Sequence, residues 1–181
     1  MNHVLYRSIA ALCGLFFLAS ALLNTSAYAD LYTLGPGDTI NINVFQEPDL
    51  SLESKISYNG TIDYPLIGEL KMKGLTLAEA ESLLDKKLRG DYLIDPQITI
   101  SIVSYRHNFV NGAVKQPRRF EYQPGITVTR AYVIAGDFTD RASPRKIYNI
   151  NEGQSSDRQR KVKHDQPIGP GEKITDKYIK I

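Results

Sequence analysis

Apolar and polar residues alternate along residues 39–45, which read TININVF. Ile40, Ile42 and Val44 fall on one side of this run, a period of two that is typical of a half-buried strand. The run QITISIVSY at residues 97–105 repeats the alternation, with isoleucine at every second position. We therefore predict two strands, each with one face toward a core.

A tight-turn signal follows the first of these strands. The dipeptide Asn59-Gly60 favours a short chain reversal. Residues 50–57 and 61–65 on either side have β character, so we expect them to pair as a hairpin.

A helical period comes next. Thr76 and Glu79 stand in the T-x-x-E relation of a capping box, and Gly90 supplies a stop. Between them, apolar residues recur every three or four positions and form one stripe. The stripe consists of Leu77, Ala80, Leu84 and Leu88.

The second half of the chain begins a new pattern. Residues 108–114 and 118–122 predict a strand pair, and Thr127 is placed to cap a short helix that runs through Ala135. Residues 145–151 predict a further strand, after which the chain is polar and turn-rich to residue 166 and closes with IGPGEKI and residues 176–181. The inward side of the short helix is expected to carry Val128, Ala131 and Ile134. Strand pair, helix, strands is the order of a β-grasp, so we predict an α+β protein whose domains are residues 30–105 and 106–181.

Two similar stretches, LGPGDTI at 34–40 and IGPGEKI at 168–174, lie near the two ends of this region. Proline followed by glycine is typical of a type II turn, in which Gly37 and Gly171 take positive φ. A phosphate-binding loop would need Lys-Ser/Thr or a helix after the glycines, and neither follows. We interpret both stretches as turns that lead into strands, with Asp38 accepting hydrogen bonds from backbone N–H groups.

The first 29 residues have the features of a secretory signal peptide. Arg7 precedes an apolar run at 8–23, and Ala27-Tyr28-Ala29 forms an A-x-A cleavage site before Asp30. Cleavage between Ala29 and Asp30 would deliver the chain to the periplasm, whereas an uncleaved anchor is the alternative. Cys13 lies in the middle of the apolar run, which argues against lipidation.

Charge and cysteine content exclude several classes. Without residues 1–29 the chain keeps 21 basic and 20 acidic side chains, so net charge indicates no partner and gives no reason to expect nucleic acid. It also keeps no cysteine, which excludes a disulfide, an iron–sulfur site and a thiol nucleophile. His107 and His164 stand alone, without a second ligand at metal-binding spacing. We expect no metal and no cofactor.

Three stretches together resemble a known family: YTLGPGDTININVFQEPDLS (32–51), YNGTIDYPLIGELKMKGLTLAEAESLL (58–84) and YLIDPQITISIV (92–103). They are similar to the polysaccharide biosynthesis/export proteins, the Wza-like outer-membrane exporters. Residues 109–141 resemble the soluble-ligand-binding β-grasp (SLBB) domain of those exporters, although Ala113 and Arg118 depart from its pattern. The turn residues that carry the likeness are Gly35, Pro36, Gly37, Asp38, Asn59, Gly60, Pro65, Gly68, Asp95, Pro96, Gly112, Pro124, Gly125, Gly136 and Gly171.

The resemblance implies a homo-oligomeric ring that passes a polysaccharide, such as a capsule or exopolysaccharide, without catalysis. Wza-like proteins continue into a membrane-spanning helix, whereas this sequence stops at Ile181. About six remaining residues cannot cross about 30 Å of hydrocarbon as a helix. We therefore expect a short form that works in the periplasm and reaches the outer membrane through a separate β-barrel protein, with an inner-membrane polysaccharide co-polymerase as its other partner.

Two other functions stay open at this point. A monomeric carbohydrate-binding module could use tyrosines for stacking or the basic residues Arg158, Arg160, Lys161 and Lys163 for an anionic polymer. A sugar-cleaving enzyme would need two carboxylates at a set separation, and the spacing pairs none of the candidates. These candidates are Asp38, Asp63, Glu69, Asp137 and Asp140, and the candidate stacking residues are Tyr58, Tyr64, Tyr105, Tyr122, Tyr132 and Tyr148. We expect no catalytic residue.

Overall fold

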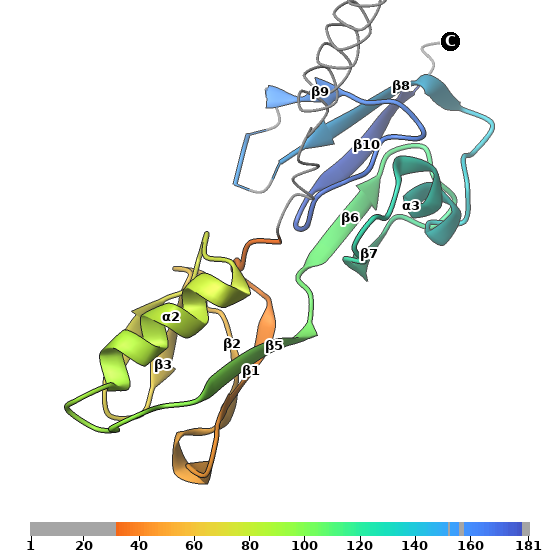
Figure 1. Cartoon of the computed structure of the whole chain (residues 1–181). Coiled ribbons are helices and arrows are strands. Elements are labelled where there is room, and N and C mark those ends of the chain that lie inside the picture. Colours follow the sequence, from red (N-terminus) through yellow and green to blue (C-terminus); the bar gives the residue numbers. More distant parts are fainter. Residues whose placement is uncertain (1–31, 152, 156–157, 179–181) are drawn as a thin grey trace, which may run out of the picture. The chain divides into compact units, whose positions relative to one another are not determined.

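The computed structural model describes residues 32–151, 153–155 and 158–178 (Figure 1). The predicted signal peptide and its cleavage site at Ala29 and Asp30 lie outside the described residues. Helices and strands are both present, with the strands arranged in three sheets, so the α+β class is confirmed.

The first sheet forms around the alternating isoleucines. Strand β1 (Thr39–Val44) is central, with β2 (Leu52–Lys55) and β5 (Ile98–Ser104) antiparallel on its two sides. A 3₁₀ turn, η2 (Pro48–Leu50), leads into β2. The inward side of β1 is fully buried, as the period of two predicts.

The predicted hairpin between residues 50–57 and 61–65 is wrong. The turn at Gly60 forms, with φ of 83°, but β3 (Thr61–Tyr64) pairs with β4 (Gly68–Lys71), and β2 pairs with β1. The carbonyl of Gly60 accepts hydrogen bonds from the backbone N–H groups of Met72 and Lys73, at 2.8 and 2.9 Å. The reversal that makes the hairpin is at residues 65–68, where Leu66 has φ of 69°.

Helix α2 (Leu77–Leu88) begins as predicted. The Thr76 hydroxyl accepts from the Glu79 N–H at 3.2 Å, and the Glu79 carboxylate accepts from the Thr76 N–H at 2.8 Å. Its buried residues pack into the core that the β2-β1-β5 sheet shares with the β3-β4 hairpin. Beside these buried residues, the Glu81 carboxylate accepts from the Ile100 N–H of β5 at 2.8 Å. Helix α2 therefore covers the core and also occupies a backbone donor of the edge strand.

The second large sheet has five strands in the order β7-β6-β10-β8-β9. Strand β10 is parallel to β6 and antiparallel to β8, and β7 and β9 are antiparallel to their neighbours. With the helix α3 after the second strand, this is the strand order of a β-grasp. The bounds are β6 (His107–Asn111), β7 (Arg118–Glu121), α3 (Val128–Ile134), β8 (Ala142–Ile150), β9 (Arg160–Lys161) and β10 (Lys173–Tyr178).

Helix α3 packs on a second core. The Thr127 hydroxyl accepts from the Arg130 N–H at 3.4 Å, so the predicted cap forms. Val128 and Ala131 are buried as expected, whereas Ile134 is only half-buried and Tyr132 is fully buried in addition. This core contains no residue of the first one. The division into domains at residues 105 and 106 stays a prediction.

No helix within the described parts of the chain has both the length and the apolar character needed to cross a membrane.

Gly112 supports a test of how β6 meets β10. Its φ is 103°, and a Cβ there would lie 2.8 Å from the backbone oxygen and 2.9 Å from the backbone nitrogen of Asp176. Gly125 also has positive φ, 78°, but nothing lies within 4 Å of its Cβ position. Both alanine variants carry the strain of a left-handed residue, about 1–2 kcal/mol. We expect Gly112→Ala to lower the free energy of unfolding in urea by about 1–3 kcal/mol more than Gly125→Ala does; equal losses would contradict the contact.

Candidate functional site

The first GPG turn (residues 35–38) is closed by its own acid. The Gly35 N–H donates to Asp38 Oδ2 at 2.8 Å, and the Asp38 N–H donates to the Gly35 carbonyl at 3.2 Å. Gly37 has φ of 94°, the positive value predicted from the Pro-Gly pair. Asp38 is completely buried. The expectation that its carboxylate accepts backbone hydrogen bonds is confirmed.

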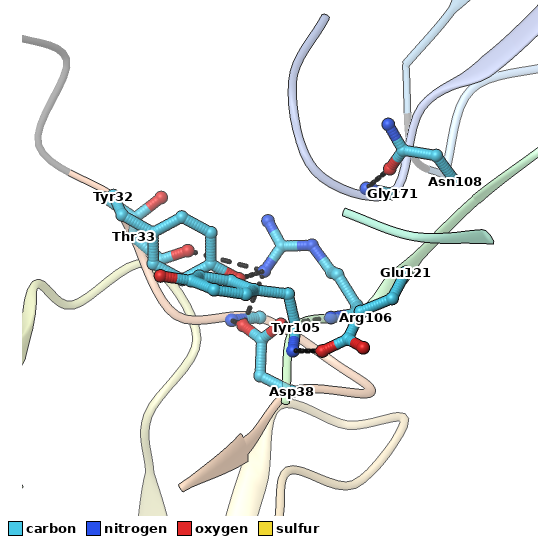
Figure 2. A network of polar contacts seen from close by, with 9 residues as sticks. Tyr32, Thr33, Asp38, Tyr105, Arg106, Asn108, Glu121 and Gly171 are labelled. Atoms are coloured by element: carbon cyan, nitrogen blue, oxygen red, sulfur yellow. Dashed lines mark hydrogen bonds and ion pairs between the residues drawn. The ribbon is translucent and has the colours of Figure 1, made fainter. Parts of the chain in front are cut away.

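Arg106 neutralises this buried carboxylate. Its Nη1 donates to Asp38 Oδ2 at 2.8 Å and its backbone N–H donates to Asp38 Oδ1 at 2.7 Å (Figure 2). The two side chains are 11% and 0% exposed. Nη1 also approaches the Thr33 carbonyl at 3.3 Å. A Cβ at Gly35 would lie 2.6 Å from the guanidinium carbon, so only glycine leaves room for Arg106.

Three tyrosines form a cluster, and one of them, Tyr32, contacts the guanidinium. Tyr32 packs edge-on against Tyr105, with ring centroids 5.0 Å apart, and stacks on Tyr122 at 6.0 Å. The guanidinium carbon of Arg106 lies 5.5 Å from the Tyr32 ring centroid, a cation–π contact. Burial, and then the neighbouring Asp38 carboxylate, raises the pKa of Tyr32 well above its ordinary value. The Tyr32 hydroxyl therefore stays neutral and accepts from Arg106 Nη1 at 3.3 Å.

The second GPG turn (residues 169–172) uses the same device. The Gly169 N–H donates to Glu172 Oε2 at 2.9 Å, and Gly171 has φ of 75°. Here the clamp is Asn108, whose amide donates to the Gly169 carbonyl at 2.9 Å and accepts from the Gly171 N–H at 2.7 Å. Asn108 is fully buried. The acid is paired differently, because Glu172 accepts from the Asn149 amide and not from a cation.

Arg106 and Asn108 are two residues apart on one extended stretch, so both point to the same side of it. Figure 2 shows Arg106 beside Asp38 and Asn108 at Gly171. A single short stretch thus holds both GPG turns. We call residues 106–108 and the two turns the turn clamp. The sequence pattern identified the turns but missed both clamping residues.

The boundary predicted between residues 105 and 106 falls inside this network. The Tyr105 N–H donates to Glu121 Oε1 at 2.9 Å, whereas the next N–H, of Arg106, donates to Asp38. The Arg106 carbonyl accepts from the Tyr122 N–H at 3.1 Å. Consecutive residues are therefore bound alternately to the second sheet and to the first GPG turn.

The other predicted turn residues are spread along the chain. Positive φ is found at Gly60, Gly68, Gly112, Gly125 and Gly136, as it is at Gly37 and Gly171. Asp95 accepts from Arg89 Nη1 at 3.0 Å, which fastens the end of α2 to the start of β5, and Pro96 is buried. Asn59 and Pro124 are exposed, and Pro65 is half-buried. Apart from Gly37 and Gly171, none of these residues takes part in the turn clamp contacts described above.

The candidate contact residues differ in position. Tyr64 and Tyr132 are buried, so neither offers a face to a sugar; burial raises the pKa of Tyr64 to about 12, and its hydroxyl donates to the Leu50 carbonyl at 2.6 Å. Tyr58 is 95% exposed. The basic residues Arg158, Arg160, Lys161 and Lys163 are exposed, at β9 and next to it.

The candidate carboxylates include one pair that the spacing did not suggest. Asp63 and Glu69 are register partners on β3 and β4, and both are exposed. Asp137 has φ of 71°, and its carbonyl accepts from the Lys115 N–H at 3.0 Å. In the described part of the chain, no group of three His, Cys, Asp or Glu side chains is arranged to hold a metal ion.

The buried ion pair gives a test of the turn clamp. Arg106→Met leaves the Asp38 carboxylate buried without its cation, so we expect the free energy of unfolding in urea to fall by about 3–5 kcal/mol. Arg89→Met removes two exposed ion pairs, with Asp85 and Asp95, and should change the free energy of unfolding much less. Adding Asp38→Asn to Arg106→Met removes the uncompensated charge, so the double variant should regain part of the loss. A double variant less stable than Arg106→Met alone would contradict the ion-pair interpretation.

Comparison with known proteins shows what the first part of the chain is similar to. Residues 26–103 match the family model described as polysaccharide biosynthesis/export protein. The chain is 26% identical over 122 residues to the exopolysaccharide production protein ExoF of Rhizobium meliloti (strain 1021), an alignment covering 61% of this chain and 29% of that protein. It is 26% identical over 116 residues to the EPS I polysaccharide export outer membrane protein EpsA of Ralstonia solanacearum, covering 50% and 30%.

This chain therefore matches only about three tenths of the length of these curated relatives. The family model extends from before the first GPG turn to the end region of β5, so it includes Asp38 but stops short of Arg106. Both relatives are named for exopolysaccharide production or export. The resemblance drawn from the three stretches within residues 32–103 is confirmed, because residues 26–103 match the model of the polysaccharide biosynthesis/export protein family.

Proposed function

We propose that this chain is a non-catalytic component of a polysaccharide export machine in the cell envelope. The observation that carries the proposal is the family match over residues 26–103, together with relatives named for exopolysaccharide production and export. The chain would form or line a passage for the polymer at the periplasmic side of the outer membrane. Its residues 106–181 would serve as the SLBB-like β-grasp domain of such an exporter.

The construction of the turn clamp supports a structural role. The Asp38 carboxylate accepts hydrogen bonds from two backbone N–H groups and from a guanidinium. The Asn108 amide is hydrogen-bonded to the second GPG turn. Groups held in this way fix the backbone and leave no free acid or base. The pair Asp63 and Glu69 lies on neighbouring strands of the β3–β4 hairpin, where both side chains are exposed to solvent.

We further propose the assembly that the sequence suggested. Copies of this chain would form a ring, with a separate outer-membrane β-barrel protein on one side and an inner-membrane polysaccharide co-polymerase on the other. Ring formation would add buried surface to two cores that are each small.

Deletion of the gene tests the export role. We expect polysaccharide outside the cell to be lost and polymer to accumulate in the periplasm, because synthesis continues while the passage is interrupted. Extracellular and periplasmic polymer would be measured as total hexose after fractionation, with the intact gene restored in trans as the control. Normal secretion in the deletion strain would contradict the proposal, and loss without periplasmic accumulation would favour a role in synthesis.

Assembly state separates the export component from a monomeric carbohydrate-binding module. Light scattering of the purified protein should give the mass of several subunits. Co-purification from envelope extract should recover the two proposed partner proteins. A stable monomer that recovers neither proposed partner would favour the binding module. Polymer cleavage by the purified protein, abolished by one carboxylate substitution, would instead establish an enzyme.

A further inference from the structure

A row of three side chains crosses the outer face of the five-stranded sheet. Arg119 on β7 is the register partner of Phe109 on β6, and Phe109 is the register partner of Lys173 on β10. Register partners on adjacent strands point to the same face of a sheet. Phe109 therefore has a basic residue opposite it on each neighbouring strand, and neighbouring strands lie about 4.8 Å apart in the hydrogen-bonding direction.

This face is turned away from the core. On β6, Asn108 and Val110 are buried, whereas Phe109 between them is 44% exposed. On β10, Ile174 is buried in the core beneath α3, which directs the neighbouring Lys173 to the opposite face. An aromatic ring that is this exposed, and flanked by charges on a pleated surface, is not explained by packing.

A cavity of about 410 Å³ lies over the row. Its wall includes Pro36 and Gly37 of the first GPG turn and Gly171 of the second, so the turn clamp shapes it. Of the described residues that line it, Arg106, His107, Arg119 and Lys173 are basic, and none is acidic.

The charges facing this cavity are not all available to a ligand. Arg106 is committed to Asp38. Glu121 is the register partner of His107, but its carboxylate accepts from the Tyr105 N–H and it does not line the cavity. Within the described residues, neither Arg119 nor Lys173 forms an ion pair with a carboxylate. These two cations are the ones that an anion entering the cavity would meet.

We propose that this cavity binds an acidic sugar unit of a polysaccharide, which deepens the proposed export function and rests on it. The apolar face of the sugar ring stacks on Phe109, and its carboxylate pairs with the guanidinium of Arg119 or the ammonium of Lys173. Arginine offers a carboxylate two parallel donors, whereas lysine adds a point charge. Because both cations are partly open to solvent, each contact is weak, which suits a polymer that must move on.

Binding of small probes tests the proposal directly. We would titrate the purified full chain with trigalacturonate, with the neutral maltotriose and with triglutamate, an anion without a sugar ring, and follow chemical shifts by NMR. Trigalacturonate should bind at least about threefold more tightly than either of the others, because only it offers both ring and charge. Raising the salt from about 0.01 M to about 0.15 M should weaken its binding.

Three variants locate the site. Arg119→Gln, Lys173→Gln and Phe109→Ala should each weaken trigalacturonate binding by about threefold to tenfold, without changing the circular dichroism of the fold. Arg118→Gln is the matched control, because it removes the neighbouring positive charge on β7. The Arg118 guanidinium donates to the Ile134 carbonyl and does not line the cavity. Lys161→Gln is a second control that removes an exposed charge on β9. Both controls should bind like the unaltered chain.

Several results would overturn the inference. Equal affinity for trigalacturonate and maltotriose would show that the charge does not contribute to binding. Equal affinity for trigalacturonate and triglutamate would show that the sugar ring does not contribute. Losses in Lys161→Gln as large as those in Arg119→Gln would indicate diffuse attraction in place of a site. If trigalacturonate does not bind, the sugar site is rejected, but the deletion experiment still tests the export function. If the deletion strain secretes normally, the export function is rejected, but any measured binding remains valid.

Discussion

The carboxylate of Asp38 has no access to water, and a buried carboxylate must find compensating charge and donors. Its cation comes from Arg106, a residue 68 positions later in the chain. The pairing fixes the direction in which the chain leaves β5 and starts β6, because the backbone N–H of Arg106 is bound as well as its side chain. If Arg106 pointed elsewhere, the first GPG turn, the tyrosine cluster and the cavity wall would all lose their geometry.

The two GPG turns share one local hydrogen-bond pattern but differ in how their acids are paired. Each acid accepts from the glycine three positions earlier, so each turn is closed by the chain itself. The first adds a buried ion pair, which is strong when intact and costly when one partner is removed. The second adds a neutral amide clamp from Asn108 and a contact between Glu172 and Asn149, and it tolerates more exposure. Both clamps come from a stretch of three residues that joins the two cores.

Much of the fold could be predicted from the sequence because its signals are local. The period of two at β1 and β5, the capping box of α2 and the Pro-Gly turns each depend on neighbouring residues. Strand pairing depends on distant residues, and the hairpin prediction therefore failed: Asn59-Gly60 does turn the chain, but β1 offers β2 a better partner. Arg106 and Asn108 were missed for the same reason, since nothing near them in sequence marks them as partners of a turn. The row formed by Arg119, Phe109 and Lys173 exists only through the register of three strands.

Strand β10 is the last strand among the described residues and yet lies in the middle of its sheet, between β6 and β8. Until residues 173–178 take their place, these two strands have no shared neighbour, and the sheet cannot close. Closing it joins segments of high sequence separation, which slows folding.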